Sequence, residues 1–288
     1  MNTDVQAAEA GSAPQDRPTA QPESGPRISY VYAISRAGTA LDAAAPGLTG
    51  LGGGPLRTVT AGGLAALVSS VPADTYSAEG MKAQLEDLAG LEAIARTHHA
   101  LVEAAYTSTT VLPMRLATVY LDDSRVTAML QERGAGFAEL LDWLEGHIEL
   151  GVKVYSDPRE AAAAEPPAPA PGAEPDSPGR AYLQKRRAQR RTHRDAYRAA
   201  GAVAAGVPER ASGLARARVV HRPQQGELAS GAGENIANEA YLVPADRVRE
   251  FRQALAGLGD DVPGVRVEIT GPWAPYSFAT PTEAGGRT

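Results

Sequence analysis

The stretch HIELGVKVYS, residues 147–156, is predicted to be a β-strand, and the segments after it decide the fold of this half of the chain. Downstream, the sequence predicts a helix at about 181–206, strands at 215–222 and 238–244, a helix from Asp246 to about residue 258, and a strand at 265–271. Asp246 is expected to be the N-cap of its helix. The order strand, helix, strand, strand, helix, strand is that of the split-βαβ motif. We therefore expect a modified ferredoxin-like (βαββαβ) domain at residues 147–272.

Stretches of proline, alanine and glycine mark the breaks in the chain. Residues 158–178 contain AEPPAPAPGAEPDSP, which favours an extended, semi-rigid linker inserted into the first crossover of the ferredoxin-like domain. Residues 1–26 have hardly any large apolar side chain, so they are expected to be disordered. Residues 273–288 form a C-terminal tail that becomes polar and glycine-rich after residue 280.

The first half of the chain, residues 27–146, is predicted to be a separate α+β domain because its strands precede its helices. Strands are expected at 28–34, 56–61 and 64–71, followed by helices at 81–106 and 124–144 and an extended segment, VLPMRLATVYL, between the two helices. Gly134 and Gly136 predict a break within the second helix. The whole chain is thus expected to be an α+β protein of two domains with a docked C-terminal tail.

The composition excludes several classes of functional site and argues against several classes of partner. The 288 residues include no cysteine, which excludes disulfides, thiolate metal sites and a cysteine nucleophile. A net charge of −6 argues against a surface that attracts nucleic acid as a whole. No apolar run approaches the roughly 20 residues that span a bilayer, and the N-terminus does not resemble a signal peptide. We expect a cytoplasmic protein without a membrane partner.

The sequence assembles no catalytic constellation. It has neither a G-x-S-x-G nor an H-E-x-x-H motif, and the glycine-rich run at 50–58 does not end as a phosphate-binding loop does. His98 lies on the apolar stripe of its helix and could be a metal ligand or an acid–base group. No second histidine follows at i+4, so a structural histidine bonded to a carbonyl or carboxylate is favoured. We expect no enzymatic activity, no cofactor and no metal.

Two further segments suggest structural roles. Pro113 interrupts the extended segment, so it is expected at a strand edge or bend. Arg115 projects from the same apolar stretch and is predicted to form a structural ion pair or hydrogen bond. Near the C-terminus, Trp273, Tyr276 and Phe278 are expected to fasten the tail to the body, although a partner-binding surface is the alternative.

The helix at 181–206 is strongly basic. Arg186, Arg190 and Arg194 recur every four residues, and Arg187 and Arg191 flank them. This pattern fits an acidic protein partner, RNA, or a solvated face with ion pairs. RNA-binding sheets stack bases on aromatic strand residues, and the predicted strands of this half offer mainly Tyr155. We therefore favour a protein partner over nucleic acid.

Several segments in order along the chain resemble the gas vesicle GvpL/GvpF family. They are YVYAI (30–34), LEAIARTHHALVEAAY (91–106), VLPMRLATVY (111–120), HIELGVKVY (147–155), GRAYLQKRR (179–187), NEAYLV (238–243) and GPWAPYSF (271–278). His98, the Leu112, Pro113, Arg115 and Thr118 set, and the Glu149, Gly151, Val152 and Lys153 set match the family patterns. Ala117 stands where the family usually has glycine, Leu150 where it has tryptophan, and Ala274 where it has proline. These departures leave the F-like and L-like types open.

The resemblance implies a non-enzymatic structural or chaperone-like role in building gas vesicles. Its implied partners are the hydrophobic major shell protein and other vesicle proteins, with association proposed at the gas-facing side. Two alternatives stay open. One is an RNA-binding ferredoxin-like module that uses the basic helix. The other is an enzyme that uses His98 with Glu103 or Arg115.

Overall fold

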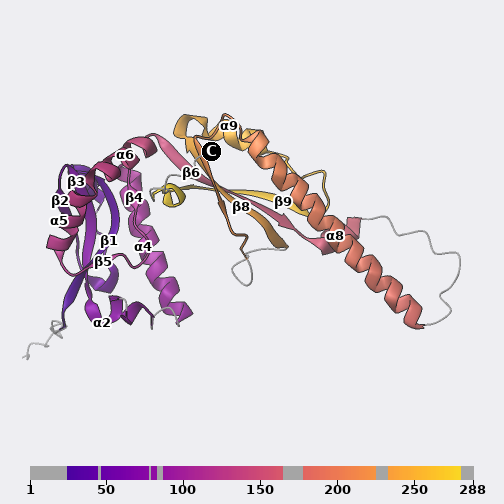
Figure 1. Ribbon diagram of the computed structural model, residues 1–288, viewed down its shortest axis with the longest axis horizontal. Coiled ribbons are helices and arrows are strands. Elements are labelled where there is room, and N and C mark those ends of the chain that lie inside the picture. Colours follow the sequence, from indigo (N-terminus) through magenta and orange to yellow (C-terminus); the bar gives the residue numbers. More distant parts are fainter. Residues whose placement is uncertain are drawn as a thin grey trace, which may run out of the picture.

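The computed structural model describes residues 25–44, 47–77, 79–82, 87–164, 178–224 and 233–279. Within these ranges the chain forms two antiparallel sheets, one after the other in sequence, each packed against its own helices (Figure 1). The two sheets and their helices are called here the N-terminal and C-terminal units. This mixed α/β architecture agrees with the predicted α+β class. The regions predicted to be disordered, 1–26, and the tail beyond residue 279 lie almost entirely outside the described residues.

The sheet of the N-terminal unit has the order β2-β3-β1-β4, and β5 also pairs with β1. Its strands are β1 (Arg27–Arg36), β2 (Leu56–Ala61), β3 (Leu64–Pro72), β4 (Leu112–Pro113) and β5 (Val119–Tyr120). The three longer strands confirm the predicted positions. A two-residue loop joins β2 to β3, and both of its residues, Gly62 and Gly63, have positive φ angles of 58° and 78°. Hairpin loops of this length favour glycine for that reason.

Strand β1 is buried on both faces and divides the N-terminal unit into two cores. The helical elements around it are α1 (Thr39–Ala44), η1 (Leu51–Gly53), α2 (Ala73–Tyr76), α4 (Leu88–Ser108), α5 (Asp123–Glu132) and α6 (Gly134–Leu144). On one face, Tyr30 and Tyr32 pack against Leu101 and Val102 of α4. On the other face, Val31 and Ile34 pack against α5 and α6. Burying both faces explains why β1 is an almost continuous apolar run.

Two helix boundaries of the N-terminal unit depend on local chemistry. Helix α4 begins at Leu88, where the Asp87 side chain accepts a hydrogen bond from the Ala89 N–H. Residues 79–82 are also helical, so the helix predicted at 81–106 is interrupted at Asp87, which has an extended backbone. The predicted break within 124–144 is confirmed. Arg133 has φ −102° and ψ 7°, outside helical geometry, and it separates α5 from α6.

The sheet of the C-terminal unit has the order β7-β8-β6-β9 with every pair antiparallel. Its elements are β6 (His147–Ser156), α7 (Pro158–Ala164), α8 (Pro178–Arg210), β7 (Ala217–His221), β8 (Glu234–Pro244), η3 (Ala245–Arg247), α9 (Val248–Leu255), β9 (Val265–Trp273) and η4 (Tyr276–Phe278). Val152 and Val154 of β6 face α8 and α9, where they pack against Val203, Val207 and Phe251. Every strand and helix predicted in this half is therefore present.

Two local predictions in this unit were wrong. Residues 158–164 form helix α7 instead of an extended linker, because Asp157 Oδ1 accepts the N–H groups of Arg159 and Glu160 and alanines follow. The remainder of the predicted linker, 165–177, lies outside the described residues. Asp246 does not cap α9; it lies inside the short turn η3 that precedes this helix.

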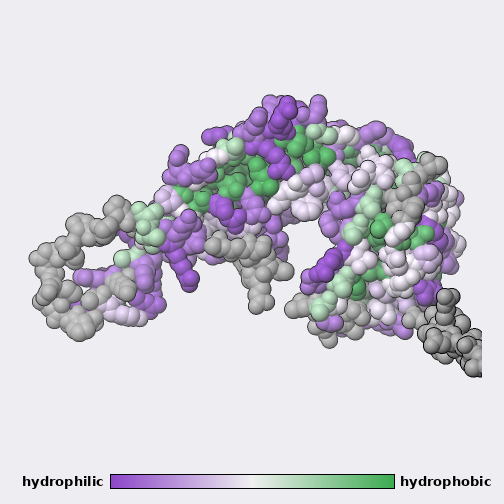
Figure 2. All heavy atoms as spheres, turned by 180° about the vertical axis from the view of Figure 1, so that it is seen from behind, coloured by the Kyte–Doolittle hydropathy of each residue, from purple (hydrophilic) through white to green (hydrophobic). Residues whose placement is uncertain are grey.

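The two units share an apolar interface. The core formed by α5 and α6 continues into the C-terminal unit through Ala240 and Leu242 of β8 and through Phe278 of η4. At the other end of the molecule, α8 extends beyond the sheet that it covers (Figure 1). Seen from behind, this projecting part is mainly hydrophilic, whereas hydrophobic residues gather over the bodies of both units (Figure 2).

Candidate functional site

The segment that follows β9 crosses from the C-terminal unit onto the N-terminal unit. Ala274 is fully buried, and its N–H donates to Glu103 Oε1 of α4 at 3.0 Å. Three residues later, the Ser277 N–H donates to Glu149 Oε2 of β6 at 2.8 Å. Residues 274–278 are called here the clasp, because they bind side chains of both units.

Glu149 of β6 is the main hydrogen-bond acceptor for the clasp. It is 7% exposed, and its Oε1 accepts a second hydrogen bond from the Ser277 hydroxyl at 2.7 Å. His221 Nε2 lies 2.9 Å from the same hydroxyl oxygen. Since that hydroxyl already donates its hydrogen to Glu149, His221 is the donor in this contact. Burial raises the pKa of Glu149, and the two hydrogen bonds from Ser277 act in the opposite direction.

The three aromatic residues of the tail have different environments. Phe278 is 5% exposed and lies 6.0 Å from Trp143 of α6, measured between ring centroids. Tyr276 is half-buried beside His99 of α4. Trp273 remains 39% exposed, 5.7 Å from the His99 ring. Of these three aromatic residues, for which a partner-binding surface was the alternative, only Trp273 presents much of its side chain to solvent.

His98 belongs to a second buried network, which lies in the N-terminal unit. Its Nε2 lies 3.1 Å from the Met114 carbonyl, and its Nδ1 lies 3.0 Å from the Tyr30 hydroxyl. A carbonyl can only accept, so Nε2 carries the hydrogen and Nδ1 accepts from Tyr30. Tyr30 in turn accepts the Ala117 N–H at 2.9 Å. Burial lowers the pKa of His98 to about 4, which keeps the ring neutral.

This network fixes the turn between β4 and β5. Pro113 is the last residue of β4 and lies opposite Ala33, at the edge of the sheet. The chain then reverses, with the Arg115 carbonyl accepting the Thr118 hydroxyl at 2.7 Å. Ala117 has a φ of 65°, a left-handed conformation that favours glycine. The family resemblance places glycine at this position, and the backbone explains that preference.

Arg115 does not make the ion pair that the sequence predicted. Its side chain is exposed, and within the described ranges no acidic partner is recorded for its guanidinium. The prediction rested on the apolar residues around Arg115, because an arginine in a buried apolar segment requires a polar partner. The strand ends at Pro113, so Arg115 lies on a turn at the surface.

The clasp resembles a hydrolase site only in composition. In a Ser–His–Asp triad the acid binds the histidine, which then accepts the serine proton. Here the acid binds the serine directly, and both Ser277 donors are used to hold the tail. The alternative site from the sequence is not assembled either, since Glu103 binds Ala274 while His98 binds Tyr30 and Met114. Both networks hold structure in place.

The sequence did not identify Ser277 of the clasp and the side chains around the clasp, Glu103, Glu149 and His221, as a site. Glu149 offered one signal, since it is an acidic residue near the start of the largely apolar strand β6. Ser277 and Glu149 are 128 residues apart, and a single sequence does not reveal such a pairing. Among the described residues, no group of three histidine or acidic side chains is arranged to hold a metal ion.

The predicted partner-binding residues Arg187 and Arg191 lie on the projecting part of α8. Residues 182–184 and 186–191 are all exposed, and burial against the sheet begins only at Ala196. Between Arg180 and Arg194 the sequence has seven lysines and arginines and no acidic residue. Arg191 Nε lies 3.7 Å from an Oδ atom of Asp195, one helical turn further along and the first acid after this run. The segment 180–194 is called here the basic arm.

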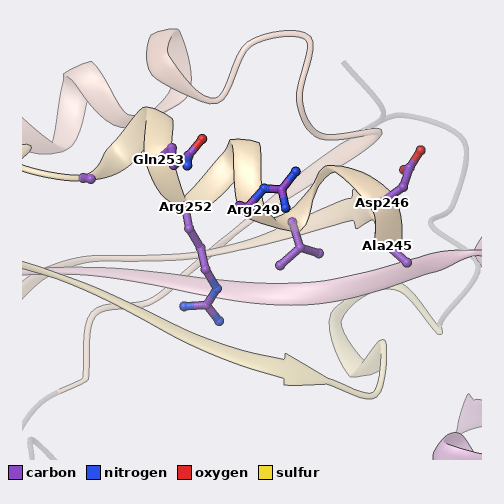
Figure 3. A pocket seen from close by; sticks show the side chains of 7 residues that line it. Ala245, Asp246, Arg249, Arg252 and Gln253 are labelled. Carbon is purple, nitrogen blue, oxygen red and sulfur yellow. The ribbon is translucent and has the colours of Figure 1, made fainter.

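A shallow hollow of about 570 Å³ lies beside α9, lined by Ala245, Asp246, Val248, Arg249, Arg252, Gln253 and Ala256 (Figure 3). Arg252 reaches from the helix toward the sheet, where it donates to the Gly271 carbonyl at 2.8 Å. This arginine therefore attaches α9 to β9.

In the described ranges no helix is long and apolar enough to cross a membrane.

The sequence from β1 to the clasp matches one family model. The model describes gas vesicle synthesis proteins GvpL/GvpF and covers residues 28–280. The chain belongs to the GvpL/GvpF family. The matched range includes both units, the basic arm and the clasp.

Two relatives come from Streptomyces sp. (strain CB03234). Gas vesicle protein L is 41% identical over 254 residues, which cover 88% of this chain and 93% of the relative. Gas vesicle protein F is 29% identical over 261 residues, covering 87% of this chain and 98% of the relative. The higher identity is thus to the L protein.

Solved structures of GvpF share the fold. The crystal structure of GvpF from Anabaena sp. PCC7120 matches with a TM-score of 0.61 and 20% identity, over 90% of this chain and 99% of that one. GvpF from Microcystis aeruginosa matches with a TM-score of 0.57 and 19% identity, over 88% and 99% of the two chains. At these identities the likeness concerns the fold alone.

Proposed function

We propose that this chain is a non-enzymatic accessory protein that helps gas vesicles to assemble by binding the major hydrophobic shell protein and other vesicle proteins. It acts in the cytoplasm in association with vesicles, at their gas-facing side. The family match over residues 28–280 carries the proposal. The 41% identity to Gas vesicle protein L favours the L-like type.

Two exposed features suit a binding role. The basic arm offers Arg187 and Arg191 on the part of α8 that precedes its buried face, where they can meet an acidic surface of a vesicle protein without rearrangement. Trp273 is a large, partly exposed ring on a rigidly held segment, and such residues often anchor interfaces. We propose the arm as the charged contact and Trp273 as the apolar one.

A pull-down with the purified shell protein and the other products of the same gene cluster tests this function. The arm variant carries Arg187→Glu and Arg191→Glu. Its matched control carries Arg125→Glu and Arg249→Glu, which reverse two exposed arginines on α5 and α9. We expect the arm variant to lose at least one partner and the control to retain all of them. If both variants retain the same partners, the basic arm is not the binding surface.

RNA binding by the basic arm is the second candidate. The seven cations of the arm favour it, because phosphate contacts dominate such binding. Tyr155 argues against it, since this aromatic residue is 2% exposed and Arg266 lies over its ring at 4.2 Å. It therefore offers no face on which to stack a base. Tight, sequence-selective retention of RNA at physiological salt would replace the assembly role.

The domain division is also a proposal. We assign residues 27–146 to an N-terminal α+β domain and residues 147–272 to a ferredoxin-like domain, with 273–288 as the tail. The strand order β7-β8-β6-β9, its antiparallel pairing and the βαββαβ succession support this assignment.

A further inference from the structure

A hollow of about 310 Å³ lies on the N-terminal unit, close to the last residue of the described tail. It forms where the β4–β5 turn meets the junction of α5 and α6. Its lining residues are Pro113, Met114, Arg115, Thr118, Tyr120, Arg133, Phe137 and Ala279. It is distinct from the clasp and far along the chain from the basic arm.

The hollow contains two arginines and no acid. Three other arginines of this unit pair with carboxylates, namely Arg36 with Asp142, Arg57 with Asp123 and Arg96 with Glu92. Arg115 and Arg133 have no such pair within the described part of the chain. Two like charges that line one hollow repel each other, so an anion bound between them would be stabilised.

Both arginines are positioned by their surroundings. The Arg133 guanidinium lies over the Phe137 ring, 4.7 Å from its centroid. It is also near enough to Tyr120 to lower the pKa of that hydroxyl, against the effect of burial. Arg115 stands on the turn that His98 and Tyr30 hold from below. The charges are therefore attached to ordered elements.

We infer that this hollow binds the carboxylate of an acidic side chain from a protein partner. Guanidinium groups match the geometry of a carboxylate and bind it through charge-assisted hydrogen bonds. The apolar wall of Pro113, Met114 and Phe137 suits the methylene stem of a glutamate. Inorganic phosphate has no apolar part and would leave that wall unused. This surface is separate from the basic arm, so it does not depend on the arm's role in the proposed function.

The test uses the full chain with ¹⁵N-labelled arginine. The Nε–Hε signals are assigned with Arg115→Gln and Arg133→Gln variants and then followed by NMR during titration. The probes are the peptide acetyl-Ala-Glu-Ala-amide, its glutamine counterpart, and inorganic phosphate at matched ionic strength. Arg125 is the control, because it is exposed on α5 outside the hollow.

We expect the glutamate peptide to shift the Arg115 and Arg133 signals saturably and to leave Arg125 unchanged. The glutamine peptide and phosphate should bind about tenfold more weakly, or not at all. Arg115→Gln should weaken the response of Arg133 by at least about fivefold, and Arg133→Gln provides the reciprocal test if one variant folds poorly. A non-saturating response, an equal response at Arg125, or tighter binding of phosphate would each overturn the inference.

Discussion

Glu149 of β6 accepts both the main-chain N–H and the side-chain hydroxyl of Ser277, at 2.8 Å and 2.7 Å. These two residues are 128 positions apart in the chain. A buried carboxylate of this kind is stable only while its hydrogen-bond donors are present. Through this pair, docking of the tail contributes to the stability of the C-terminal unit.

Replacing Ser277 with alanine removes one donor to Glu149 and the acceptor of His221. We expect the free energy of unfolding to fall by about 1–3 kcal/mol, since a buried polar group is left with fewer partners. Urea denaturation followed by circular dichroism measures this loss. The control is Ser212→Ala, an exposed position, which should change stability by less than about 0.5 kcal/mol.

Glu149 also gives stability a pH dependence. Its folded-state pKa is raised above the unfolded value of about 4.3, so the folded chain holds this proton to a higher pH. Its contribution is then greatest below about pH 4.3 and is lost as the pH rises through the folded pKa. The unfolding free energy of the wild type minus that of Glu149→Gln should therefore decrease across this window and then level off. A difference that increases with pH would contradict the burial argument.

Alanine variants of Phe278 and Trp273 distinguish a packing role of the tail from a partner-binding role. Phe278→Ala empties a packed site and should cost about 3–5 kcal/mol, with a marked fall in melting temperature. Trp273→Ala removes a ring that is 39% exposed, so we expect a clearly smaller loss. Differential scanning calorimetry of both variants provides the comparison. If deleting residues 273–288 leaves the melting temperature unchanged, the tail is not docked in solution.

Because His98 is buried as a neutral ring, we expect the protein to lose stability in acid. Its pKa is lowered to about 4 from an ordinary value of about 6.5, so the unfolded chain takes up the proton first as the pH falls. The stability contributed by the neutral ring is present above about pH 6.5 and declines by about 3 kcal/mol toward pH 4. A series of urea denaturations at these pH values should show the decline in the wild type but not in His98→Gln. His193→Gln, at an exposed position, should retain it.

Ala117 is a site where glycine should stabilise the fold. Its left-handed backbone costs an L-residue about 1–2 kcal/mol, a cost that glycine avoids. The greater entropy of the unfolded chain with glycine offsets about 0.5–1 kcal/mol of this gain. Ala117→Gly should therefore raise the unfolding free energy by up to about 1 kcal/mol. The matched change Ala128→Gly, exposed within α5, should lower it by about the same amount.

The sequence was informative wherever local chemistry decides structure. Alternating apolar residues located the strands, and the glycines at 134 and 136 marked the break between α5 and α6. The order of elements from residue 147 indicated the arrangement of the second sheet. Local cues were insufficient at Pro158–Ala164, where proline density suggested an extended chain but an aspartate cap and alanines form a helix.

The sites were harder to predict for a physical reason. The clasp joins α4, β6 and β7 to a segment near the end of the chain, and these contacts depend on packing that no local pattern encodes. Arg115 was misjudged because its surroundings depend on where β4 ends. The structural role of His98 was easier to predict, since its place on the apolar stripe of α4 already indicated burial.

The clasp also bears on the order in which the protein can be completed during translation. Residues 274–278 are synthesised after every strand of both sheets, yet they bind Glu103 of α4 and Glu149 of β6. While the ribosome still holds this segment, the sheet of the N-terminal unit can form, but the clasp cannot fasten the two units together. The nascent chain therefore passes through a stage in which the groups beneath the clasp, including the apolar site of Phe278, are open to solvent and to cellular chaperones.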